Sequence, residues 1–230
     1  MSRQFARPYA GLFNLRTLFD QALDLLYPPC CERCGRVDTL WCDRCAAELA
    51  RLPLDIVQRT LSPFAGLAST APHHGVLRDA IHSLKYSGNP AIAAHLSARL
   101  TSLVSTLGWK PSACIPVPIH RERQRKRRYN QSELLAQGLS MSLGIPTLTE
   151  ALQRERDTQP QVGLTSTERM RNVADAFRCA TRFHGETLLL IDDVCTTGAT
   201  LAACAEALLL AGAGQLYAVT VTAATISSFT

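Results

Sequence analysis

Two neighbouring carboxylates precede a hydroxyl-rich turn near the C-terminal end of the chain. Asp192 and Asp193 follow the apolar run 188–191. The turn after them contains Thr196, Thr197, Gly198, Ala199 and Thr200. Four consecutive apolar residues are typical of a strand buried in a parallel sheet, and good helix formers run from Leu201 to near Gly212. The predicted order is therefore strand, acidic pair, turn and helix, and open α/β sheets bind ligands at the carboxyl ends of such strands.

This combination suits a sugar phosphate. A turn that opens a helix offers backbone N–H groups and the positive end of the helix dipole to a phosphate, and Gly198 lets the backbone come close. Asp192 and Asp193 are suited to accept hydrogen bonds from ribose hydroxyls, or to lie near a Mg²⁺ that also contacts pyrophosphate. The competing interpretation is a buried strand whose carboxylates only cap the next helix. The length of the combined pattern favours a ligand pocket, with both aspartates as candidate catalytic residues.

Two Cys-x-x-Cys pairs lie in the N-terminal part of the chain. Cys31 and Cys34 form the first pair, and Cys42 and Cys45 form the second. Four thiolates on two tight turns are predicted to surround a zinc ion at ~2.3 Å, and such a closed site stabilises a small module rather than catalysing a reaction. A redox or disulfide pair is the alternative. Cys30 is a further candidate ligand, although Cys31 is favoured because it has the two-residue spacing to Cys34.

The excess positive charge of the chain is concentrated in one segment. The net charge is +5, and residues 121–128 contain six basic residues and one acidic residue, which accounts for all of it. These basic residues are Arg121, Arg123, Arg125, Lys126, Arg127 and Arg128. Because the segment follows an expected strand at 113–118, we predict a loop that binds pyrophosphate through forked charge-assisted bonds, together with Asn130 and Gln131. Tyr129 beside it supports a second interpretation, contact with a nucleic-acid backbone; a solvated charged segment is the third.

Apolar periodicity places the remaining elements. Helices are expected over 11–26, 75–86 and 133–143, with another through 92–103. Strands are expected over 61–70 and 215–224. A polar loop is predicted over 152–161, followed by a helix over 165–177, and Arg154 or Arg156 would close over a bound ligand. Lys85, at the end of the helix over 75–86, is either solvated or directed at the pocket.

Composition limits the class of protein. A chain of 230 residues holds one core of ~150 residues and a small module, which we divide into 1–55 and 56–230. No apolar run reaches the ~18 residues of a membrane span. The N-terminal residues lack the apolar run of a secretory signal, so we expect a cytoplasmic protein. In that compartment, paired cysteines indicate metal binding rather than disulfides.

With these features in order, the chain resembles the ComF family, which includes competence protein F and ComFC. The acidic turn resembles the 5-phosphoribosyl-1-pyrophosphate (PRPP) signature of type I phosphoribosyltransferases, and Cys195 is its one departure. The other matching motifs are Cys31-x-x-Cys34-Gly35, Cys42-x-x-Cys45, Leu84-Lys85-Tyr86-x-Gly88, Pro116-Val117-Pro118, Tyr129-Asn130-Gln131-Ser132 and Gln159-x-Gln161. Arg128 stands where the family usually has glycine.

The resemblance implies an α/β fold with a type I phosphoribosyltransferase-like open, mainly parallel sheet flanked by helices and preceded by a four-cysteine zinc ribbon. It implies binding of PRPP, or another ribose phosphate, together with Mg²⁺. The residues expected to bind it are Asp192, Asp193, Thr196, Thr197, Gly198, Ala199, Thr200, Lys85 and Arg154. It also implies handling of single-stranded DNA in the cytosol during natural transformation, with DNA-uptake, helicase or recombination proteins as candidate partners. The alternative is an active phosphoribosyltransferase with an unidentified base or amine acceptor.

Overall fold

The computed structural model describes residues 28–155 and 176–224. The helix predicted over 11–26, Arg156 and most of the helix predicted over 165–177 lie outside the described residues. The helices are α2 Asp43–Arg51, α3 Gly75–Tyr86, η1 Pro90–Ile92, α4 Ala93–Leu107, α5 Arg121–Arg127, α6 Gln131–Leu143 and α8 Ala199–Leu210. The strands are β1 Val57–Arg59, β2 Gly66–Pro72, β3 Ala113–Pro116, β4 Leu152–Arg154, β5 Phe177–Cys179, β6 Leu188–Cys195 and β7 Leu216–Ala223.

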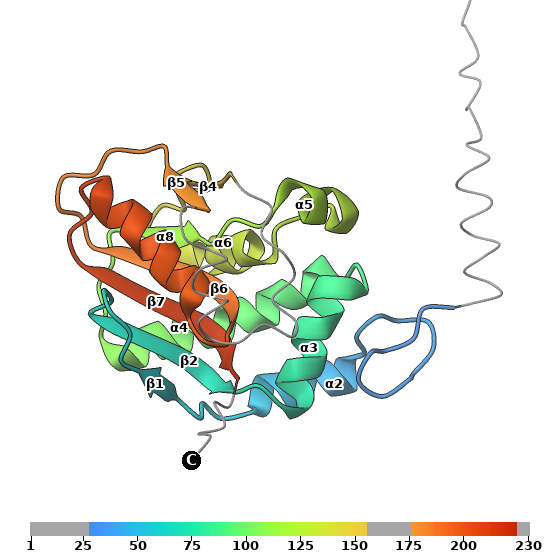
Figure 1. Cartoon of the computed structure of the whole chain (residues 1–230). Coiled ribbons are helices and arrows are strands. Elements are labelled where there is room, and N and C mark those ends of the chain that lie inside the picture. Colours follow the sequence, from blue (N-terminus) through green and yellow to red (C-terminus); the bar gives the residue numbers. More distant parts are fainter. Residues whose placement is uncertain (1–27, 156–175, 225–230) are drawn as a thin grey trace, which may run out of the picture.

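The main sheet is mostly parallel. Within the described residues it has five strands in the order β1-β2-β7-β6-β3, and β4 pairs with β5 in a separate antiparallel ribbon. Strands β2, β7, β6 and β3 are parallel, and only β1 runs against its neighbour. The parallel strands therefore end at one common edge (Figure 1). The predicted α/β fold with a mainly parallel sheet is confirmed.

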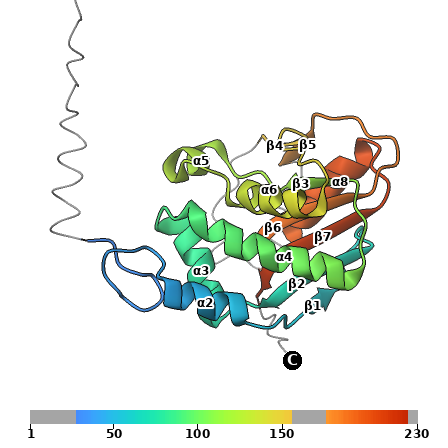
Figure 2. The ribbon, with the colours of Figure 1, turned by 180° about the vertical axis from the view of Figure 1, so that it is seen from behind.

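Both faces of this sheet are covered by helices. Side chains along a strand point alternately to opposite faces, so Leu189 and Ile191 of β6 pack in one buried cluster while Leu188 and Leu190 pack in the other. Helices α3, α4 and α6 cover the first face, and α8 covers the second (Figures 1 and 2). Burial on both faces explains why β6 begins with four apolar residues in a row.

Buried hydroxyl groups bond across the pair β2 and β7. Ser69 Oγ lies 2.6 Å from Thr220 Oγ1, and these two residues are direct partners in the strand register. Further along, His73 Nδ1 lies 2.7 Å from Thr222 Oγ1. The buried Ser69 and Thr220 hydroxyls thereby satisfy each other inside the sheet, and the partly buried His73 continues the polar contacts just past the end of β2.

The acidic pair lies within a strand rather than after one. Strand β6 continues to Cys195, and Asp192 and Val194 pair with Thr220 and Thr222 of β7. The prediction that the strand stops at residue 191 was therefore wrong, because pairing with β7 extends it past the apolar run. Helix α8 also begins earlier than predicted, at Ala199.

The basic segment forms helix α5, so the prediction of a loop was wrong. Arginine, lysine and glutamate are good helix formers, and His120 Nδ1 accepts a hydrogen bond from the Glu122 N–H at the helix start. Glu122 and Lys126, four residues apart, form an ion pair at 2.8 Å. The helix ends at Arg128, whose φ of 71° is the left-handed conformation that glycine adopts most easily.

Three other assignments also differ from prediction. Residues Leu152–Arg154 form strand β4 instead of the start of a loop, because they pair with β5. Phe177 belongs to β5 and not to a helix end. Strand β2 begins at Gly66, five residues after the predicted start at 61. The formation of β4 and β5 depends on pairing between segments that are distant in the sequence, which local composition does not reveal.

Arg99, a buried arginine on α4, ties the cysteine-bearing segment to the sheet. It is 7% exposed. Its guanidinium donates to the backbone carbonyls of Leu52 and Pro53 and to Thr70 Oγ1. Burial lowers the pKa of Arg99, but arginine stays charged in proteins, so these acceptors stabilise a buried cation.

We expect Arg99→Ala to lower the free energy of unfolding by about 2–4 kcal/mol, because the buried Arg99 side chain loses its packing and two carbonyls lose charge-assisted hydrogen bonds. Arg99→Lys should have an intermediate effect, since an ammonium lacks the forked geometry. Urea unfolding measures both, with exposed Arg182→Ala as a control expected within about 0.5 kcal/mol of the wild type. A similarly small change for Arg99→Ala would show that the carbonyls find other donors.

Candidate functional site

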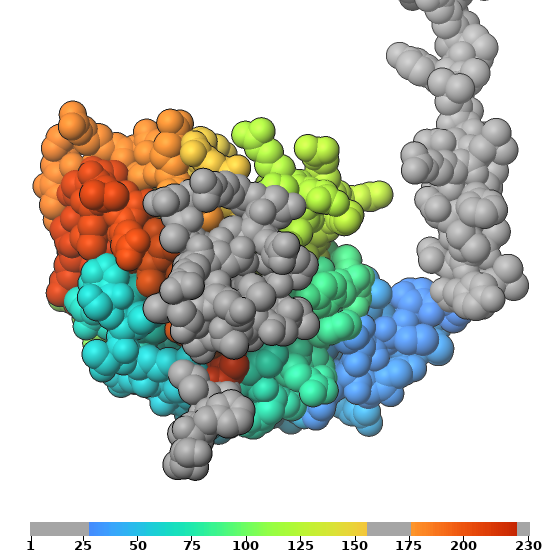
Figure 3. Space-filling model, in the orientation of Figure 1, coloured from blue at the N-terminus to red at the C-terminus, as the bar shows by residue number. Residues whose placement is uncertain are grey.

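A cavity of about 900 Å³ opens at the carboxyl ends of the parallel strands. Strand β6, the start of α8, the end of α3 and the segment between β3 and α5 all contribute to its lining. Figure 3 shows α5 projecting above α3. The cysteine module, residues 28–51 with the four clustered cysteines and α2, lies beside α3 at one end of the molecule. The cavity therefore lies where segments distant in sequence meet.

The acidic pair is held by two neighbouring helices. Asp193 is 3% exposed, and its Oδ1 lies 2.7 Å from Lys85 Nζ of α3. Asp192 Oδ1 accepts hydrogen bonds from Ser132 Oγ of α6 at 2.8 Å and from the Asp193 N–H at 2.9 Å. Asp193 Oδ2 is buried without a hydrogen-bond partner among the described residues. One buried carboxylate oxygen at the cavity is thus left without a donor among these residues.

The charges at this position shift one another's pKa values. Burial, together with the negative charge of Asp193, raises the pKa of Asp192 to about 7. Burial works against the charged form of Lys85, but Asp193 outweighs it and raises the pKa of that ammonium. Lys85 is therefore a cation near neutral pH, while Asp192 changes its charge in that range.

The turn before α8 has a backbone shape that requires glycine. Gly198 has φ +82°, and a Cβ there would lie 2.4 Å from Leu61 Cδ2. Gly198 is the N-cap of α8 and provides no side-chain cap. The N-terminus of this helix faces the cavity, since Gly198, Ala199 and Thr200 line it. Thr197 instead supports the turn itself, since its Oγ1 accepts a hydrogen bond from the Ala199 N–H at 3.4 Å.

Arg59 braces the back of this turn. It extends from the edge strand β1 and donates to the backbone carbonyls of Thr196 and Ala224. Its Nη1 also lies 3.6 Å from Cys195 Sγ. Burial raises the pKa of that thiol, so Cys195 is a neutral, packed side chain near neutral pH. This is compatible with the small apolar role that the position has in the predicted signature.

Most of the predicted PRPP-binding residues line this cavity. They are Asp192, Asp193, Thr196, Gly198, Ala199, Thr200, Lys85 and Arg154. Thr197 is the member of the predicted set that does not line it among the described residues. The choice left open for Lys85 is decided by its ion pair with Asp193. Arg154 lies on β4, with its guanidinium carbon 5.3 Å from the centre of the Phe177 ring.

The predicted basic set divides into two groups. Arg123 and Gln131 line the cavity, whereas the other basic residues of α5 lie along an exposed helix. Asn130 is buried and serves the fold, because its side chain caps α6 through the Ser132 N–H and donates to the Val117 carbonyl. Gln131 Oε1 accepts a hydrogen bond from Arg127.

Sequence reasoning missed two residues of this region, Arg59 and His73. His73 lines the cavity, and burial together with the nearby Lys85 lowers the pKa of its imidazole. Its position directly after β2, at the carboxyl edge of the sheet, was a usable signal. Arg59 had no comparable signal, because its role depends on how β1 lies against the turn.

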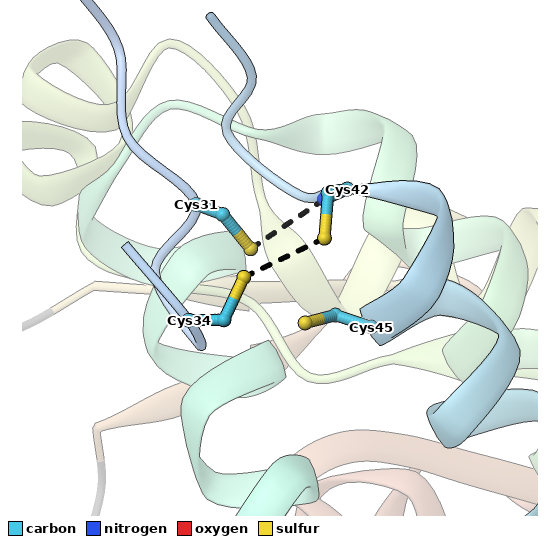
Figure 4. Close-up of side chains that lie close together, drawn as sticks. All are labelled: Cys31, Cys34, Cys42 and Cys45. Atoms are coloured by element: carbon cyan, nitrogen blue, oxygen red, sulfur yellow. Dashed lines mark hydrogen bonds between the residues drawn. The ribbon is translucent and has the colours of Figure 1, made fainter. Parts of the chain in front are cut away.

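The four predicted cysteine ligands form a second site (Figure 4). The sulfur atoms of Cys31, Cys34, Cys42 and Cys45 all lie within 4.8 Å of one another and point inward. Sulfurs held at ~2.3 Å around a zinc ion are about 3.8 Å apart, and Cys34 Sγ and Cys42 Sγ lie 3.6 Å apart. The cluster therefore fits a structural zinc ion. Cys30 is exposed and outside the cluster.

Only the first cysteine pair lies on a tight turn. Gly35 closes that turn with φ +73° and an N–H that donates to the Cys31 carbonyl at 2.8 Å. Cys42 is the N-cap of α2 and Cys45 lies in its first turn, so the prediction of two tight turns was wrong. Burial of Cys31 opposes its ionisation. Hydrogen bonds from the backbone of Cys42, Cys34 and Arg33 nevertheless lower the pKa of Cys31 to about 6. A thiolate, the form that binds metal, is thus favoured there.

Ion pairs attach the cysteine module to helix α3. Arg33 bridges Glu48 and Asp79, with both N–O distances at 2.9 Å. Glu32 Oε1 lies 2.6 Å from His82 Nδ1, and Glu32 Oε2 accepts a hydrogen bond from Ser87 Oγ at 2.7 Å. Because α3 also carries Lys85, the module and the cavity share one helix.

Within the described residues, every helix is too short or too polar to cross a membrane. The fold and its sites thus define an α/β protein with a ligand cavity at the edge of a parallel sheet and a four-cysteine module beside it.

No family model matches the chain. The DNA utilization protein YhgH of Escherichia coli is 36% identical over 193 residues, which are 81% of this chain and 85% of that protein. Competence protein F of Haemophilus influenzae is 44% identical over 94 residues, 40% of this chain and 41% of that protein. ComFC of Bacillus subtilis is 26% identical over 203 residues, 87% of this chain and 76% of that protein.

The chain belongs to the ComF family, since the YhgH proteins match most of its length at this level of identity. Among solved structures, adenine phosphoribosyltransferase from Saccharomyces cerevisiae is 15% identical, with a TM-score of 0.41 over 80% of this chain and 90% of that chain. The family assignment rests on the sequence relatives.

We expect the purified protein to carry one zinc ion per chain, and Cys31→Ser to lose it, because a missing thiolate opens the closed site. Cys30→Ser is the matched control and should keep its zinc, since Cys30 is outside the cluster. Native mass spectrometry measures the metal content of both. Equal zinc retention by the two variants would contradict the assigned ligand set.

We expect Asp192→Asn to stabilise the protein above neutral pH. The pKa of Asp192 is about 7 in the folded protein and about 3.9 in an unfolded chain. The folded state therefore binds more protons between these values, and its stability falls as pH rises through that window. The substitution should raise the free energy of unfolding by about 1–3 kcal/mol at pH 8 and by little at pH 4.

Urea unfolding at both pH values measures this change. Exposed Asp38→Asn is the control and should show no such dependence on pH. A gain for Asp192→Asn that is equally large in acid would contradict the raised pKa.

Proposed function

We propose that this protein binds PRPP with Mg²⁺ in the cavity and single-stranded DNA beside it, and that it acts in the cytosol during natural transformation. The observation that carries the PRPP proposal is the buried Oδ2 of Asp193, which has no hydrogen-bond partner in the part of the chain that the structure describes. A buried acceptor without a donor costs about 1–3 kcal/mol, and a ribose hydroxyl is a donor that would satisfy it. The family membership, with relatives named for competence and DNA utilization, supports the DNA part.

The acidic pair suits the ribose and its metal. Asp193 would accept hydrogen bonds from ribose hydroxyls, and Asp192 with Asp193 would hold Mg²⁺, which prefers carboxylate oxygens and the oxygens of a bound pyrophosphate. The metal would neutralise part of the pyrophosphate charge. Because Mg²⁺ favours the ionised form of Asp192, binding should strengthen as pH rises through about 7.

The cavity also has separate positions for two phosphate groups. The N-terminus of α8, with Thr196, Gly198 and Thr200, suits the 5′-phosphate. Lys85, Arg123 and Arg154 line other parts of the cavity and would contact the pyrophosphate. Positive side chains and a helix N-terminus thus surround a pair of carboxylates, as a ligand with phosphates at both ends of a ribose requires.

Helix α5 supports the proposal of DNA binding. It has no buried residue, and its basic side chains form a compact surface at the cavity rim. Lysine and arginine contacts to phosphates provide sequence-independent affinity that weakens with salt. Candidate protein partners are the DNA-uptake, helicase or recombination proteins that handle the same strand.

A second candidate function is transfer of ribose 5-phosphate from PRPP to an acceptor. The cavity of about 900 Å³ favours it, because this is near the upper end of the ~300–1,000 Å³ of ligand pockets and leaves room beside PRPP. Release of pyrophosphate from PRPP in the presence of a base or amine would identify this activity. Binding of PRPP without pyrophosphate release would favour the first candidate.

We expect calorimetric titration with PRPP and Mg²⁺ to show one binding site per chain. Asp193→Asn should weaken PRPP binding about tenfold or more, because it removes an ionic acceptor for the ribose and metal. Titration of PRPP with and without short oligo(dT) then measures coupling, which is reciprocal between the two ligands. Absence of PRPP binding by the wild type at every pH tested would contradict the proposal.

The DNA part has its own variants. Glutamine substitutions at Arg121, Arg123 and Arg125 together should make the log–log salt slope shallower by about 2, since each phosphate contact contributes about 0.7 for single strands. The matched control changes three exposed cations elsewhere, Arg51, Lys110 and Arg182, to glutamine. Equal slopes for the two triple variants would show that α5 does not contact the DNA backbone.

A further inference from the structure

Tyr86 is an exposed aromatic residue at the junction of the cavity and the basic helix. It is the last residue of α3, it is 69% exposed, and it lines the cavity. It directly follows Lys85, which pairs with Asp193. A single exposed apolar side chain is common on protein surfaces, so the case for Tyr86 depends on its place at the cavity and on the side chains around its ring.

Neighbouring side chains hold the Tyr86 ring in place. The guanidinium carbon of Arg127, on α5, lies 5.5 Å from the ring centre, which is within cation–π distance. The His82 ring lies one helical turn earlier, with 4.8 Å between ring centres and a tilt of 45°. The ring is therefore oriented before any ligand arrives, while most of its surface remains open.

Tyr129, the aromatic residue that the sequence places beside the basic segment, has a different role. It is half-buried, and its hydroxyl donates to the Leu84 carbonyl at 2.6 Å. It thus joins the start of α6 to the end of α3 and contributes to the position of Tyr86. The aromatic surface next to α5 comes from α3.

We propose that Tyr86 stacks a base of single-stranded DNA whose phosphates contact the basic side chains of α5. This inference rests on the proposed DNA-binding function and assigns the base contact that a phosphate surface alone lacks. Proteins that bind single strands without sequence preference combine a positive surface with an aromatic ring on which a base stacks. A duplex does not fit this arrangement, because its bases are stacked on one another inside the helix.

The position of the ring connects the two ligands. A base on Tyr86 would lie in the same cavity as Asp193, and Lys85, the residue directly before Tyr86, forms the ion pair with Asp193. PRPP that draws Lys85 toward its pyrophosphate would change the end of α3 where the base rests. The two ligands are therefore expected to change each other's affinity through α3.

Fluorescence anisotropy with two labelled strands tests this inference. One strand is a short oligo(dT), and the other has the same length and phosphates but abasic sugars. Tyr86→Ala should weaken binding of oligo(dT) about tenfold, the effect of losing one stacked base, and leave binding of the abasic strand unchanged. Tyr86→Phe keeps the ring and should bind both strands like the wild type. The salt slope should stay the same in Tyr86→Ala, because no phosphate contact is lost.

The outcomes separate this inference from the proposed function. If the wild type binds neither strand, the DNA-binding function fails and the stacking site with it. If the wild type binds oligo(dT) and Tyr86→Ala binds it equally well, the stacking site alone is wrong. If Tyr86→Ala weakens both strands equally, Tyr86 acts by holding Arg127, and the stacking site is again overturned. Tyr86→Leu, with circular dichroism to verify the fold, separates loss of the aromatic ring from loss of an apolar side chain.

Discussion

Two adjacent carboxylates near the end of β6, Asp193 buried and Asp192 partly buried, set the energetic requirement for this part of the molecule, because like charges taken out of water need compensation. The compensation comes from two helices on the same face of the sheet. Lys85 of α3 neutralises Asp193, and Ser132 of α6 holds Asp192. The hydroxyl of Tyr129 then joins these helices to each other. Their placement is therefore determined by chemistry at the sheet edge as well as by apolar packing.

Helix α3 links the three functional parts of the chain through one stripe of side chains. Asp79, His82 and Tyr86 have the spacing i, i+3, i+7, which places them on one side of a helix. The first two contact the cysteine module, and the third faces α5. The opposite side of α3 is packed in the core. A helix fixed on one side can hold groups on its other side at constant separation, so the module, the cavity and the basic surface are positioned together.

The parts of the fold that depend on local pattern could be predicted from sequence, and the parts that depend on long-range pairing could not. The helix over 75–86 and the grouping of the four cysteines were predicted correctly, because periodicity and spacing define them locally. The strand extension through Asp193 was missed because β7 supplies it. A dense run of like charges predicts a loop over the basic segment, whereas the helix propensity of arginine, lysine and glutamate determines its structure. The role of Arg59 could not be predicted, because its partners, Thr196 and Ala224, are more than a hundred residues away in the sequence.

The buried hydroxyl pairs between β2 and β7 have a consequence for folding specificity. A strand covered on both faces is apolar on both, so hydrophobicity hardly distinguishes the native alignment from one shifted by a residue. Ser69 and Thr220, like His73 and Thr222, satisfy each other only in the native alignment. A slip by one residue would turn these side chains to opposite faces and take the buried Ser69 hydroxyl away from its partner, at about 1–3 kcal/mol. Polar contacts that add little net stability thereby make misaligned pairing of the central strands unfavourable.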